Sequence, residues 1–340
     1  MKIPFFDYPR LFLDKKDEYM NIFSDVASRG AFIMQSDVDN FEENLAKFSS
    51  SKYAIGVGNA TDGLEISWMA LNLRQGDEVI CCSHTMLATA SAIKVAGGIP
   101  IPVEIGYDNL IDPDAIEDAI TSRTVGIMPT QLNGRTCDME RIMQIANKYK
   151  LYVVEDAAQA LGSKFKGKNA GTFGHSSAIS FFPAKVLGCF GDAGAILCQD
   201  ETIFDRAYQL HDHGRDKDGN VKSWGRNSRL DNLQAAILNF NLKSYEKVIQ
   251  RRREIATMYC SKLSILEELK LPESPNNNSD HFDVFQNYEL VAKRRDELQK
   301  YLRECGIGTL IQWGGKAIHQ WEHLGFNLRL PKSEAFFKEC

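Results

Sequence analysis

Short apolar runs alternate with helical stretches between residues 50 and 200. The apolar and β-branched residues of these runs are continuous, which is typical of strands covered by helices on both faces. Between them, Asp112-Pro113 can cap and begin a helix, and Met139, Ile142, Met143 and Ala146 recur at helical spacing. The order predicts an α/β fold with a mostly parallel central sheet. The strand candidates are Val79–Cys82, Ile99–Val103, Val125–Met128, Leu151–Val154, Ala178–Phe182 and Ala195–Cys198.

The pattern changes after Arg229. A long helical stretch leads into a polar loop, and strand-like and helix-like segments follow the loop. We therefore expect a large domain over residues 1–235 and a small C-terminal α+β domain over residues 236–340. The expected segments are a helix over Asn232–Leu266, a loop over Pro272–Asp280, a strand over Phe285–Val291, a helix over Arg294–Cys305 and a strand over Gly308–Trp313.

The composition is that of an ordinary globular protein. The chain has 340 residues, of which 44% are hydrophobic and 25% are charged, enough for one large and one smaller domain. The formal net charge is −5, and no run of basic residues is interleaved with aromatic ones, which argues against a nucleic-acid surface. Arg251–Arg253 form a basic cluster that we expect on a solvated helix face.

Targeting and metal-binding signals are not evident. The segment Met1–Asp7 lacks the basic start and apolar core of a signal peptide, and no apolar run approaches the ~20 residues that span a bilayer. We therefore expect a cytoplasmic protein without membrane attachment. The eight cysteines include no C-x-x-C pair, which fits neither a zinc site nor a disulfide framework. We expect no bound metal and reduced, mostly buried thiols.

The first chemical cluster is Gly-Val-Gly-Asn-Ala-Thr-Asp-Gly at 56–63, between an apolar segment and a helix. Loop glycines, hydroxyl groups and free N–H groups at a helix N-terminus favour a phosphate, because the helix dipole also attracts an anion. The third glycine of a dinucleotide-binding motif is absent, and nothing resembles a Walker lysine. On this segment alone, a phosphate cradle and a plain capped helix are equally supported.

The second cluster, Glu155-Asp156, comes directly after the Leu151–Val154 strand. A carboxylate at the carboxyl end of a central parallel strand lies where α/β sheets bind ligands, and its burial is costly without a cation. A protonated pyridine nitrogen is one candidate partner for Asp156. An N-cap for the next helix is the alternative.

The third cluster places Lys185 in a tight turn between an apolar strand and the glycine-rich segment Gly191-Asp192-Ala193-Gly194. Desolvation in such a turn depresses the pKa of a lysine and makes it a usable amine for Schiff-base chemistry. With the two upstream clusters in this order, the functional interpretation of Lys185 is favoured.

Four ordered motifs resemble the DegT/DnrJ/EryC1/StrS sugar aminotransferases. They are Asn-Ala-Thr-Asp-Gly-Leu at 59–64, Glu-Asp-Ala-Ala-Gln at 155–159, Ser-Phe-Phe-Pro-Ala-Lys at 180–185 and Gly-Arg-Asn-Ser-Arg-Leu-Asp at 225–231. The resemblance implies an aspartate aminotransferase-like enzyme of fold type I that uses pyridoxal 5′-phosphate (PLP). It also implies a homodimer with active sites at the subunit interface.

The matched residues near the phosphate follow from this resemblance. It implies that Ala60, Thr61 and Asp62 hold the PLP phosphate with backbone and hydroxyl donors, assisted by Ser180. It also implies that Asn227 reaches the phosphate from the neighbouring subunit.

Around the ring, the resemblance implies that Asp156 pairs with the pyridine nitrogen, Gln159 contacts the ring hydroxyl and Lys185 forms the internal aldimine. Arg229 and His319 are its candidates for substrate contact. A structural salt bridge is an equal alternative for Arg229.

The sequence departs from the family pattern in three places. Met86 stands where most members have an aromatic residue that stacks on the cofactor ring, and a thioether offers less contact area. The segment Ile311–His319 replaces a more usual Tyr-Pro-x-Pro-x-His stretch near the sugar site, which indicates an unusual acceptor. Family members continue past a Leu-Pro segment into a closing helix, so we expect the native C-terminus to extend beyond Cys340.

The implied reaction takes an amino group from L-glutamate and gives it to a nucleotide-linked keto-sugar, for amino sugars of surface polysaccharides or glycosylated products. The Gly-Asp-Ala-Gly segment at 191–194 favours a 3-keto over a 4-keto acceptor. A cyclitol aminotransferase and a PLP-binding regulatory protein of the same family are the alternatives. Sugar 3-dehydratases carry histidine at the lysine position, so Lys185 argues against them.

Overall fold

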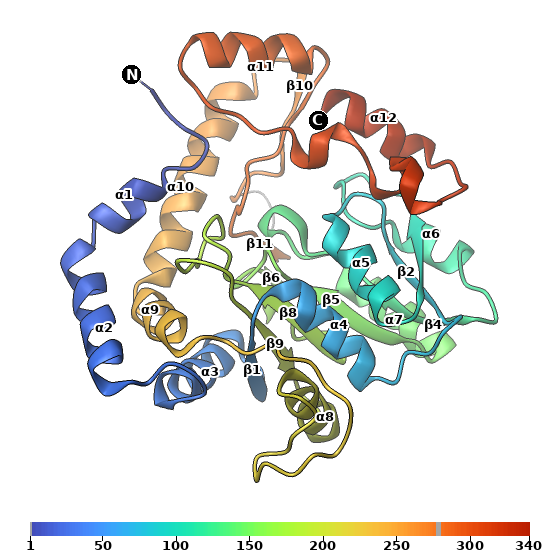
Figure 1. Cartoon of the computed structure of the whole chain (residues 1–340). Coiled ribbons are helices and arrows are strands. Elements are labelled where there is room, and N and C mark those ends of the chain that lie inside the picture. The colour runs from blue at the N-terminus through green and yellow to red at the C-terminus, as the bar shows by residue number, and fades with distance from the viewer. Residues whose placement is uncertain (1, 277–279) are drawn as a thin grey trace.

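The computed structural model describes residues 2–276 and 280–340. A seven-stranded sheet forms the centre of its larger part (Figure 1). The strand order is β1-β9-β8-β5-β4-β2-β3, and β9 alone runs opposite to the other strands. The expected α/β fold with a mostly parallel sheet is therefore confirmed. The strands are β1 Tyr53–Val57, β2 Glu78–Cys82, β3 Ile99–Val103, β4 Thr124–Met128, β5 Tyr152–Asp156, β8 Ser176–Ser180 and β9 Gly194–Cys198.

Helices cover both faces of this sheet, and the alternation within β2 shows how. Val79 and Cys81 pack in one apolar cluster with Trp68 of α4 (Ala60–Ala70) and with α5 (Leu87–Val95). Ile80 and Cys82 point the other way, towards α6 (Pro113–Asp118) and α7 (Met139–Tyr149). Strands buried on both sides need continuous apolar runs, which is why the sequence pattern predicts them well.

The N-terminal helices wrap the other end of the sheet. They are α1 (Tyr8–Leu13), α2 (Lys16–Arg29) and α3 (Ser36–Ser49), and α3 packs with α9 (Asn232–Leu242) over β1 and β9. The Tyr19 hydroxyl in α2 donates to Asn241 Oδ1 at 3.0 Å, and Asn232 Nδ2 donates to the Ala31 carbonyl at 2.7 Å. On the opposite face, α8 (Glu201–His211) packs beside α4.

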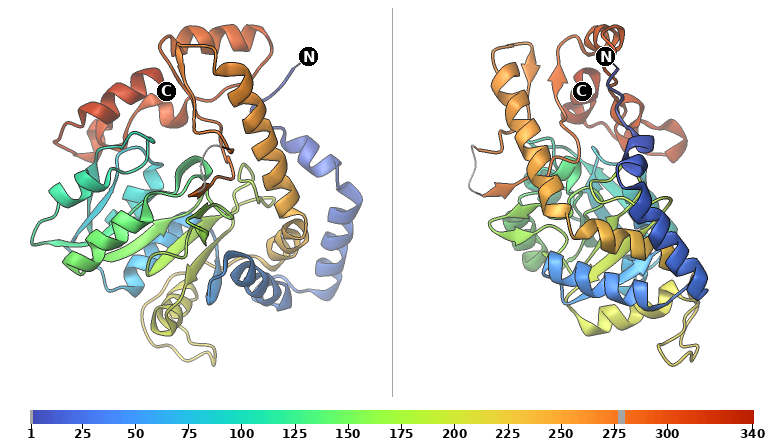
Figure 2. Two further views of the ribbon diagram at one scale, coloured as in Figure 1. Left: turned by 180° about the vertical axis from the view of Figure 1, so that it is seen from behind. Right: turned by 90° about the vertical axis from the view of Figure 1, so that its left-hand side faces the viewer.

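The C-terminal part is smaller and less regular. The long helix α10 (Tyr245–Leu263) leads from the sheet towards it, as Figure 2 shows. One short strand, β11, pairs with β6 of the larger part and so connects the two. The remaining elements are β6 Lys164–Phe165, β7 Lys168–Asn169, β10 Leu269–Lys270, β11 His281–Phe282, β12 Val291–Ala292, α11 Arg295–Glu304, α12 Pro331–Glu339 and the 3-10 turns Leu132–Gly134, Gln312–Gly315, Ile318–Gln320 and Glu322–Leu324.

The strand expected over Phe285–Val291 is wrong except at its last residue. Phe285, the first residue of the segment, has φ of 52°, so an extended strand cannot include it. The carbonyls of Phe285 and Gln286 also bond to a side chain and not to another strand. Arg252 Nη1 donates to the Phe285 carbonyl at 2.9 Å and to the Gln286 carbonyl at 3.1 Å. The segment is therefore an ordered, side-chain-supported loop that leads into β12.

Two further expectations change. The Gly308–Trp313 segment forms no strand: the Gly308 N–H donates to the Ile3 carbonyl at 2.8 Å as part of an isolated bridge between Ile3 and Ile307, and Trp313 adopts φ of 48°. The helix expected over Asn232–Leu266 is divided into α9 and α10. The loop expected over 272–280 includes residues 277–279, which lie outside the described chain.

The basic cluster is not a solvated face. Arg252 and Arg253 of α10 are half-buried and donate to backbone carbonyls of the 283–286 loop. Of the three arginines, Arg251 alone is exposed, and it pairs with Glu254 at 3.0 Å.

Within residues 2–276 and 280–340, no helix combines the length and apolar character needed to cross a membrane.

Candidate active site

The carboxyl ends of five strands meet at one edge of the sheet, and the residues with predicted roles follow these ends. Strands β1, β2, β4, β5 and β8 point in one direction, so this edge is where an open α/β sheet binds ligands. The segments that converge there are 59–62, 85–89, 130–133, 156–159 and 180–185.

A phosphate-sized cradle forms at the start of α4. Asn59 caps the helix, and its Oδ1 accepts a hydrogen bond from the Asp62 N–H at 2.9 Å. The N–H groups of Ala60 and Thr61 belong to the first turn and have no acceptor within the helix. Together with the helix dipole they make this end attractive to an anion.

Gly194 shows how closely the sheet approaches this cradle. A Cβ atom on Gly194 would lie 2.5 Å from the Asn59 carbonyl carbon and 2.6 Å from the Ala60 nitrogen. Ser180 is the partner of Gly194 across β8 and β9, so its half-exposed side chain points to the same face. The structure therefore brings Ser180 to the cradle formed by residues 59–62.

Asp156 is the last residue of β5 and is 4% exposed. Burial raises the pKa of its carboxyl group, and three neighbours partly offset that effect. The Thr89 hydroxyl donates to Oδ2 at 2.6 Å, the Ala158 N–H donates to Oδ1 at 3.2 Å, and Lys185 contributes its positive charge. The carboxylate is thus held by neutral donors and still benefits from a cation.

The neighbouring Glu155 points to the other face of β5 and has a different role. Its carboxylate accepts hydrogen bonds from Gln131 Nε2 (2.7 Å) and from the backbone N–H groups of Gly171 (2.8 Å), Phe173 (2.6 Å) and Gly174 (2.8 Å). Glu155 therefore organises the 171–174 loop, and of the two adjacent carboxylates only Asp156 lies near Lys185.

Gln159 is oriented by the loop after β4. The Asn133 N–H donates to Gln159 Oε1 at 2.8 Å, which leaves the Nε2 group of Gln159 as a donor for another partner. Asn133 itself sits at φ of 56°, and its Oδ1 accepts from Asn287 (2.9 Å) and Gln312 (2.7 Å). Residues of the C-terminal part thus help to set the direction of the Gln159 amide.

Lys185 lies in the turn after β8, and its backbone N–H donates to the Phe182 carbonyl at 2.8 Å. Burial lowers the pKa of its amine, and the negative charge of Asp156 partly counters this effect. Gly188 closes the turn, since a Cβ there would lie 2.9 Å from the Pro183 carbonyl oxygen. A half-buried lysine with a lowered pKa has the character of a usable nucleophile and base.

Two glutamines hold this turn, and sequence reasoning missed both. Gln286 accepts from the Val186 N–H at 3.0 Å and donates to the Ala184 carbonyl at 2.8 Å, so it bonds to the residues on either side of Lys185. Gln234 of α9 makes the same pair of bonds to the backbone of Phe190 (3.0 and 2.8 Å). Neither glutamine is near Lys185 in sequence, so no local motif signals the contact.

Met86 caps helix α5 next to the segment that carries Thr85 and Thr89. Its sulfur accepts from the Ala88 N–H at 3.0 Å, and 47% of the residue is exposed. The part of the Met86 side chain that faces away from Ala88 is therefore free to contact a bound molecule. Its contact with a cofactor ring stays a prediction.

The segment that carries Asn227 packs against the cradle through its neighbour. Ser228 Oγ accepts from the Gly58 N–H at 3.1 Å and donates to Asp62 Oδ2 at 2.7 Å. Asn227 is exposed, whereas Arg229 is bonded to Asp212 Oδ1 at 3.2 Å. In this chain Arg229 therefore makes the structural salt bridge, and Asn227 is directed to the surface.

His319 is buried beneath α12. Its Nε2 lies 3.5 Å from Glu334 Oε1, and burial lowers the pKa of its imidazole. The preceding residue, Ile318, donates its N–H to the Ser83 carbonyl at 3.1 Å. These contacts anchor the 311–319 segment on the end of β2, and they do not include the Lys185 turn.

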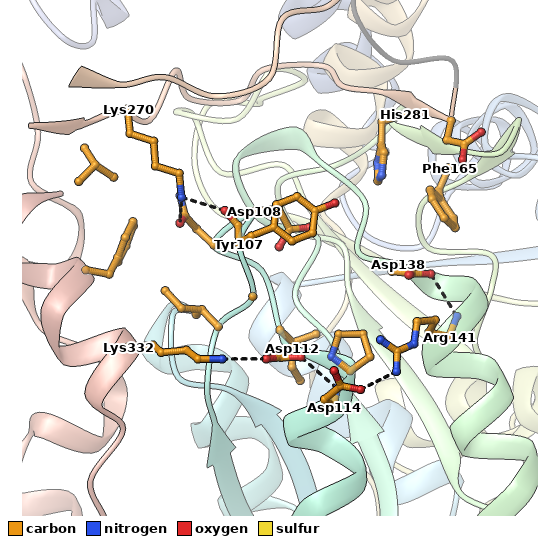
Figure 3. Close-up of a pocket in the computed structure, with 18 of the residues that line it drawn as sticks. Tyr107, Asp108, Asp112, Asp114, Asp138, Arg141, Phe165, Lys270, His281 and Lys332 are labelled. Carbon is orange, nitrogen blue, oxygen red and sulfur yellow. Dashed lines mark hydrogen bonds and ion pairs between the residues drawn. The ribbon is translucent and has the colours of Figure 1, made fainter. Parts of the chain in front are cut away.

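A cavity of about 840 Å³ opens elsewhere, among the loops after β3, the start of α7 and α12 (Figure 3). None of the residues with predicted roles lines it. Its lysines and arginines already have partners in the wall: Lys332 with Asp112 (3.3 Å), Arg141 with Asp114 (2.6 Å), Lys270 with the Tyr107 carbonyl (2.8 Å) and Lys166 with Glu140. The cavity is therefore separate from the residues with predicted roles.

Comparisons with known proteins agree with this geometry. Residues 13–340 match the family model of the DegT/DnrJ/EryC1/StrS aminotransferase family. The chain is 39% identical to the dTDP-3-amino-3,6-dideoxy-alpha-D-galactopyranose transaminase of Aneurinibacillus thermoaerophilus, over 99% of this chain and 92% of that protein. It is 36% identical to a "pleiotropic regulatory protein" of Geobacillus stearothermophilus, over 100% of this chain and 92% of that one.

The likeness extends to solved structures. The S. venezuelae protein DesV in complex with a ketimine intermediate has a TM-score of 0.95 and 32% identity, with 99% of this chain and 91% of DesV covered. The matched family, the homologous transaminase and the shared fold point to one conclusion. The chain belongs to the DegT/DnrJ/EryC1/StrS aminotransferase family and is a PLP-dependent aminotransferase.

Proposed function

We propose that this aminotransferase moves an amino group from L-glutamate to the keto group of a nucleotide-linked sugar, with a 3-keto acceptor preferred over a 4-keto one. The product is an amino sugar for a surface polysaccharide or a glycosylated compound. The observation that carries the proposal is the convergence of three features at one edge of the sheet: the buried Asp156 at the end of β5, the Lys185 turn after β8 and the α4 cradle after β1.

The residues present fit PLP. The close contact of Gly194 with the Asn59–Ala60 peptide brings Ser180 to the free N–H groups of α4, as a phosphate requires. The buried Asp156 has two neutral donors and still gains from a positive charge, as a carboxylate facing a pyridinium would. When bound, PLP supplies an aldehyde carbon that amines can join and a ring that accepts electrons.

Lys185 holds the cofactor and moves protons. Because burial lowers the pKa of its amine, the neutral form of Nζ is more accessible than on an exposed lysine. Nζ would then be placed to take a proton from Cα of the amino donor and to hold it for the next transfer. Asp156 would keep the ring nitrogen protonated, and the free Nε2 of Gln159 would donate to the ring hydroxyl oxygen.

The sugar specificity rests on two observations. The Gly191–Gly194 segment follows the pattern that the family resemblance associates with 3-keto acceptors. The A. thermoaerophilus relative is named for a dTDP-linked 3-amino sugar. From these two observations we infer that this enzyme prefers a 3-keto nucleotide sugar as its acceptor.

A regulatory role is the second candidate, because the G. stearothermophilus relative carries a regulatory name. Lys185, Asp156 and Gln159 are all present in this chain, which favours catalysis. A cyclitol aminotransferase would share the same cofactor residues and differ only in the acceptor. Reaction with L-glutamate separates enzyme from regulator, and the acceptor panel described below separates sugars from cyclitols.

We also infer a homodimer with shared active sites. Four large apolar side chains are exposed in the single chain: Phe182 (46%), Phe190 (44%), Met86 (47%) and Trp224 (96%). Exposed apolar surface is one mark of a protein interface. The exposed Asn227 lies on the same segment as Trp224, so a second copy covering these residues would bring Asn227 towards a neighbouring cradle.

The test begins with the lysine. PLP-loaded wild-type protein should show the visible absorption band of lysine-bound cofactor, and the band should be absent from Lys185→Ala. Lys94→Ala, which removes an exposed lysine of α5, should keep it. L-Glutamate should then bleach the band, and mass spectrometry should find amino sugars after incubation with 3-keto and 4-keto nucleotide sugars and keto-inositols. A wild-type protein that takes up no PLP would end the proposal, and a band that L-glutamate leaves unchanged would favour the regulatory role.

A further inference from the structure

Three buried threonine hydroxyls form a continuous chain that ends on Asp156. Thr130 Oγ1 lies 2.8 Å from Thr85 Oγ1, which lies 2.6 Å from Thr89 Oγ1, and Thr89 Oγ1 lies 2.6 Å from Asp156 Oδ2. The exposed fractions of the three threonines are 4%, 1% and 0%. The chain connects the end of β4, the turn after β2, helix α5 and the end of β5.

The direction of every proton in this chain follows from counting donors. An ionised Asp156 can only accept, so Thr89 must donate its single proton to it. Thr89 then has no proton left for Thr85, and Thr85 must donate to Thr89. By the same step, Thr130 must donate to Thr85. All three O–H dipoles therefore point towards the carboxylate.

Aligned dipoles at short range oppose the effect of burial. A hydrogen bond to a charged acceptor is stronger than one between neutral groups, and chains of hydrogen bonds in a low-dielectric interior strengthen one another. Simple packing does not require these hydroxyls, since valine has nearly the same shape as threonine. What the oxygens add is the hydrogen-bonded path to Asp156, directly from Thr89 and through Thr89 from Thr85 and Thr130.

We propose that Thr130, Thr85 and Thr89 are positioning residues that keep Asp156 ionised and fix its direction towards the pyridine nitrogen of the cofactor. The inference rests on the proposed role of Asp156. Thr89 acts directly on the carboxylate, and Thr85 and Thr130 act through Thr89. The effect of removing a hydroxyl should therefore decrease with its distance from Asp156.

The test reads the proton on the cofactor nitrogen directly. PLP labelled with ¹⁵N in its ring is bound to each variant, and the ¹⁵N chemical shift is followed against pH to find the midpoint of nitrogen deprotonation. Thr89→Val should lower that midpoint by about one to two units, a loss of roughly 10- to 100-fold in proton affinity. Thr85→Val should give a smaller decrease and Thr130→Val the smallest. Thr89→Ser, which keeps the hydroxyl, should restore the wild-type midpoint.

Two further variants separate the possible failures. Thr172→Val removes another buried hydroxyl, which donates to the Asn169 carbonyl at 2.7 Å, and it should leave the midpoint unchanged. Asp156→Asn should lower the midpoint more than any threonine variant. If Asp156→Asn has no effect, the proposed role of Asp156 fails; if Asp156→Asn acts but Thr89→Val matches wild type, the threonine inference alone is overturned. Should Thr89→Val not fold, Thr85→Val decides the question, and a wild-type midpoint in that variant overturns the inference.

Discussion

At the residue scale, the geometry of Lys185 depends on a side chain that is remote in sequence. Gln286 is 7% exposed and bonds to the Ala184 carbonyl and the Val186 N–H, so it holds the peptide groups on both sides of the lysine. Its own backbone carbonyl accepts from Arg252. The position of the amine is therefore fixed from the C-terminal part of the chain.

Replacing Gln286 with leucine should loosen this turn. The variant loses two hydrogen bonds in a buried place, which lowers the free energy of unfolding by about 1–3 kcal/mol. Because proton transfer depends on the placement of Nζ, we expect the reaction of bound cofactor with L-glutamate to slow roughly 10- to 100-fold. Stopped-flow absorbance measures the rate, and urea unfolding measures the stability.

Gln234→Leu is the matched control, since Gln234 makes the same pair of bonds to the backbone of Phe190. Its two bonds are exposed, whereas those of Gln286 are partly buried, so we expect a smaller loss of stability and a rate close to that of wild type. Equal rate losses in the two variants would contradict a specific effect on Lys185 and would assign the loss to the segment as a whole.

The sequence identifies residues whose chemistry is visible in a local motif, and it misses those that act from a distance. Lys185, Asp156 and the 59–62 cradle occur beside strand ends that the apolar pattern already locates. Gln286 is recognisable only after the loop carrying it has been placed against the lysine turn. The hydroxyl of Thr89 likewise reaches Asp156 only when α5 is packed beside β5.

At the element scale, helix α3 is joined to β1 by a half-buried carboxyl group. Glu42 Oε1 accepts from the Gly56 N–H at 2.6 Å, and burial raises the pKa of this carboxyl to about 7, with the Gly56 hydrogen bond partly opposing the increase. An acid whose pKa is raised by folding stabilises the protein fully only below its unfolded pKa. That contribution is lost as pH rises to about 7, because the native state must then lose a proton that it holds more tightly than the unfolded chain.

Glu42→Gln should remove this pH dependence, because the amide keeps an oxygen for the Gly56 N–H and carries no charge. At pH 8 we expect the free energy of unfolding to rise by up to about 3 kcal/mol over wild type, and the gain should shrink as pH falls towards 5. Urea unfolding across this range measures it. Glu43→Gln, at an exposed neighbour paired with Lys47, should show no such gain, and a pH-independent difference for Glu42→Gln would contradict the assignment.

The elements that the sequence predicts well share one property. Six of the seven strands of the central sheet are expected from their apolar runs, and their observed bounds lie within two residues of those expected. The seventh, β1, is not among the strand candidates. The segments over Phe285–Val291 and Gly308–Trp313 have apolar residues of similar kind, yet positive φ at Phe285 and Trp313 excludes one end residue of each, and the rest of each segment is not built into a sheet except at Val291. Their backbone groups bond to Arg252 and Ile3, contacts that no local pattern contains.

At the scale of the whole molecule, the proposed homodimer predicts that one chain is not the complete catalytic unit. Phe182, Phe190 and Trp224 would be covered by a second copy, and Asn227 would cross to the neighbouring cradle. The family resemblance implies this arrangement, while the division into residues 1–235 and 236–340 and the partner contact of Asn227 stay predictions. A functional test can decide whether Asn227 contacts the partner's site without a structure of the dimer.

Mixed dimers test whether Asn227 acts on its own site or on that of its partner. Lys185→Ala and Asn227→Ala should each be nearly inactive alone, the first for lack of the amine and the second for weak phosphate binding. In a dimer containing one copy of each, a site with Lys185 from one chain receives the intact Asn227 of the other, so one of the two sites is restored. Random mixing makes half the dimers mixed, and total activity should return to about a quarter of wild type. If Asn227 instead served the site of its own chain, both sites of every mixed dimer would carry one defect, and mixing would restore nothing.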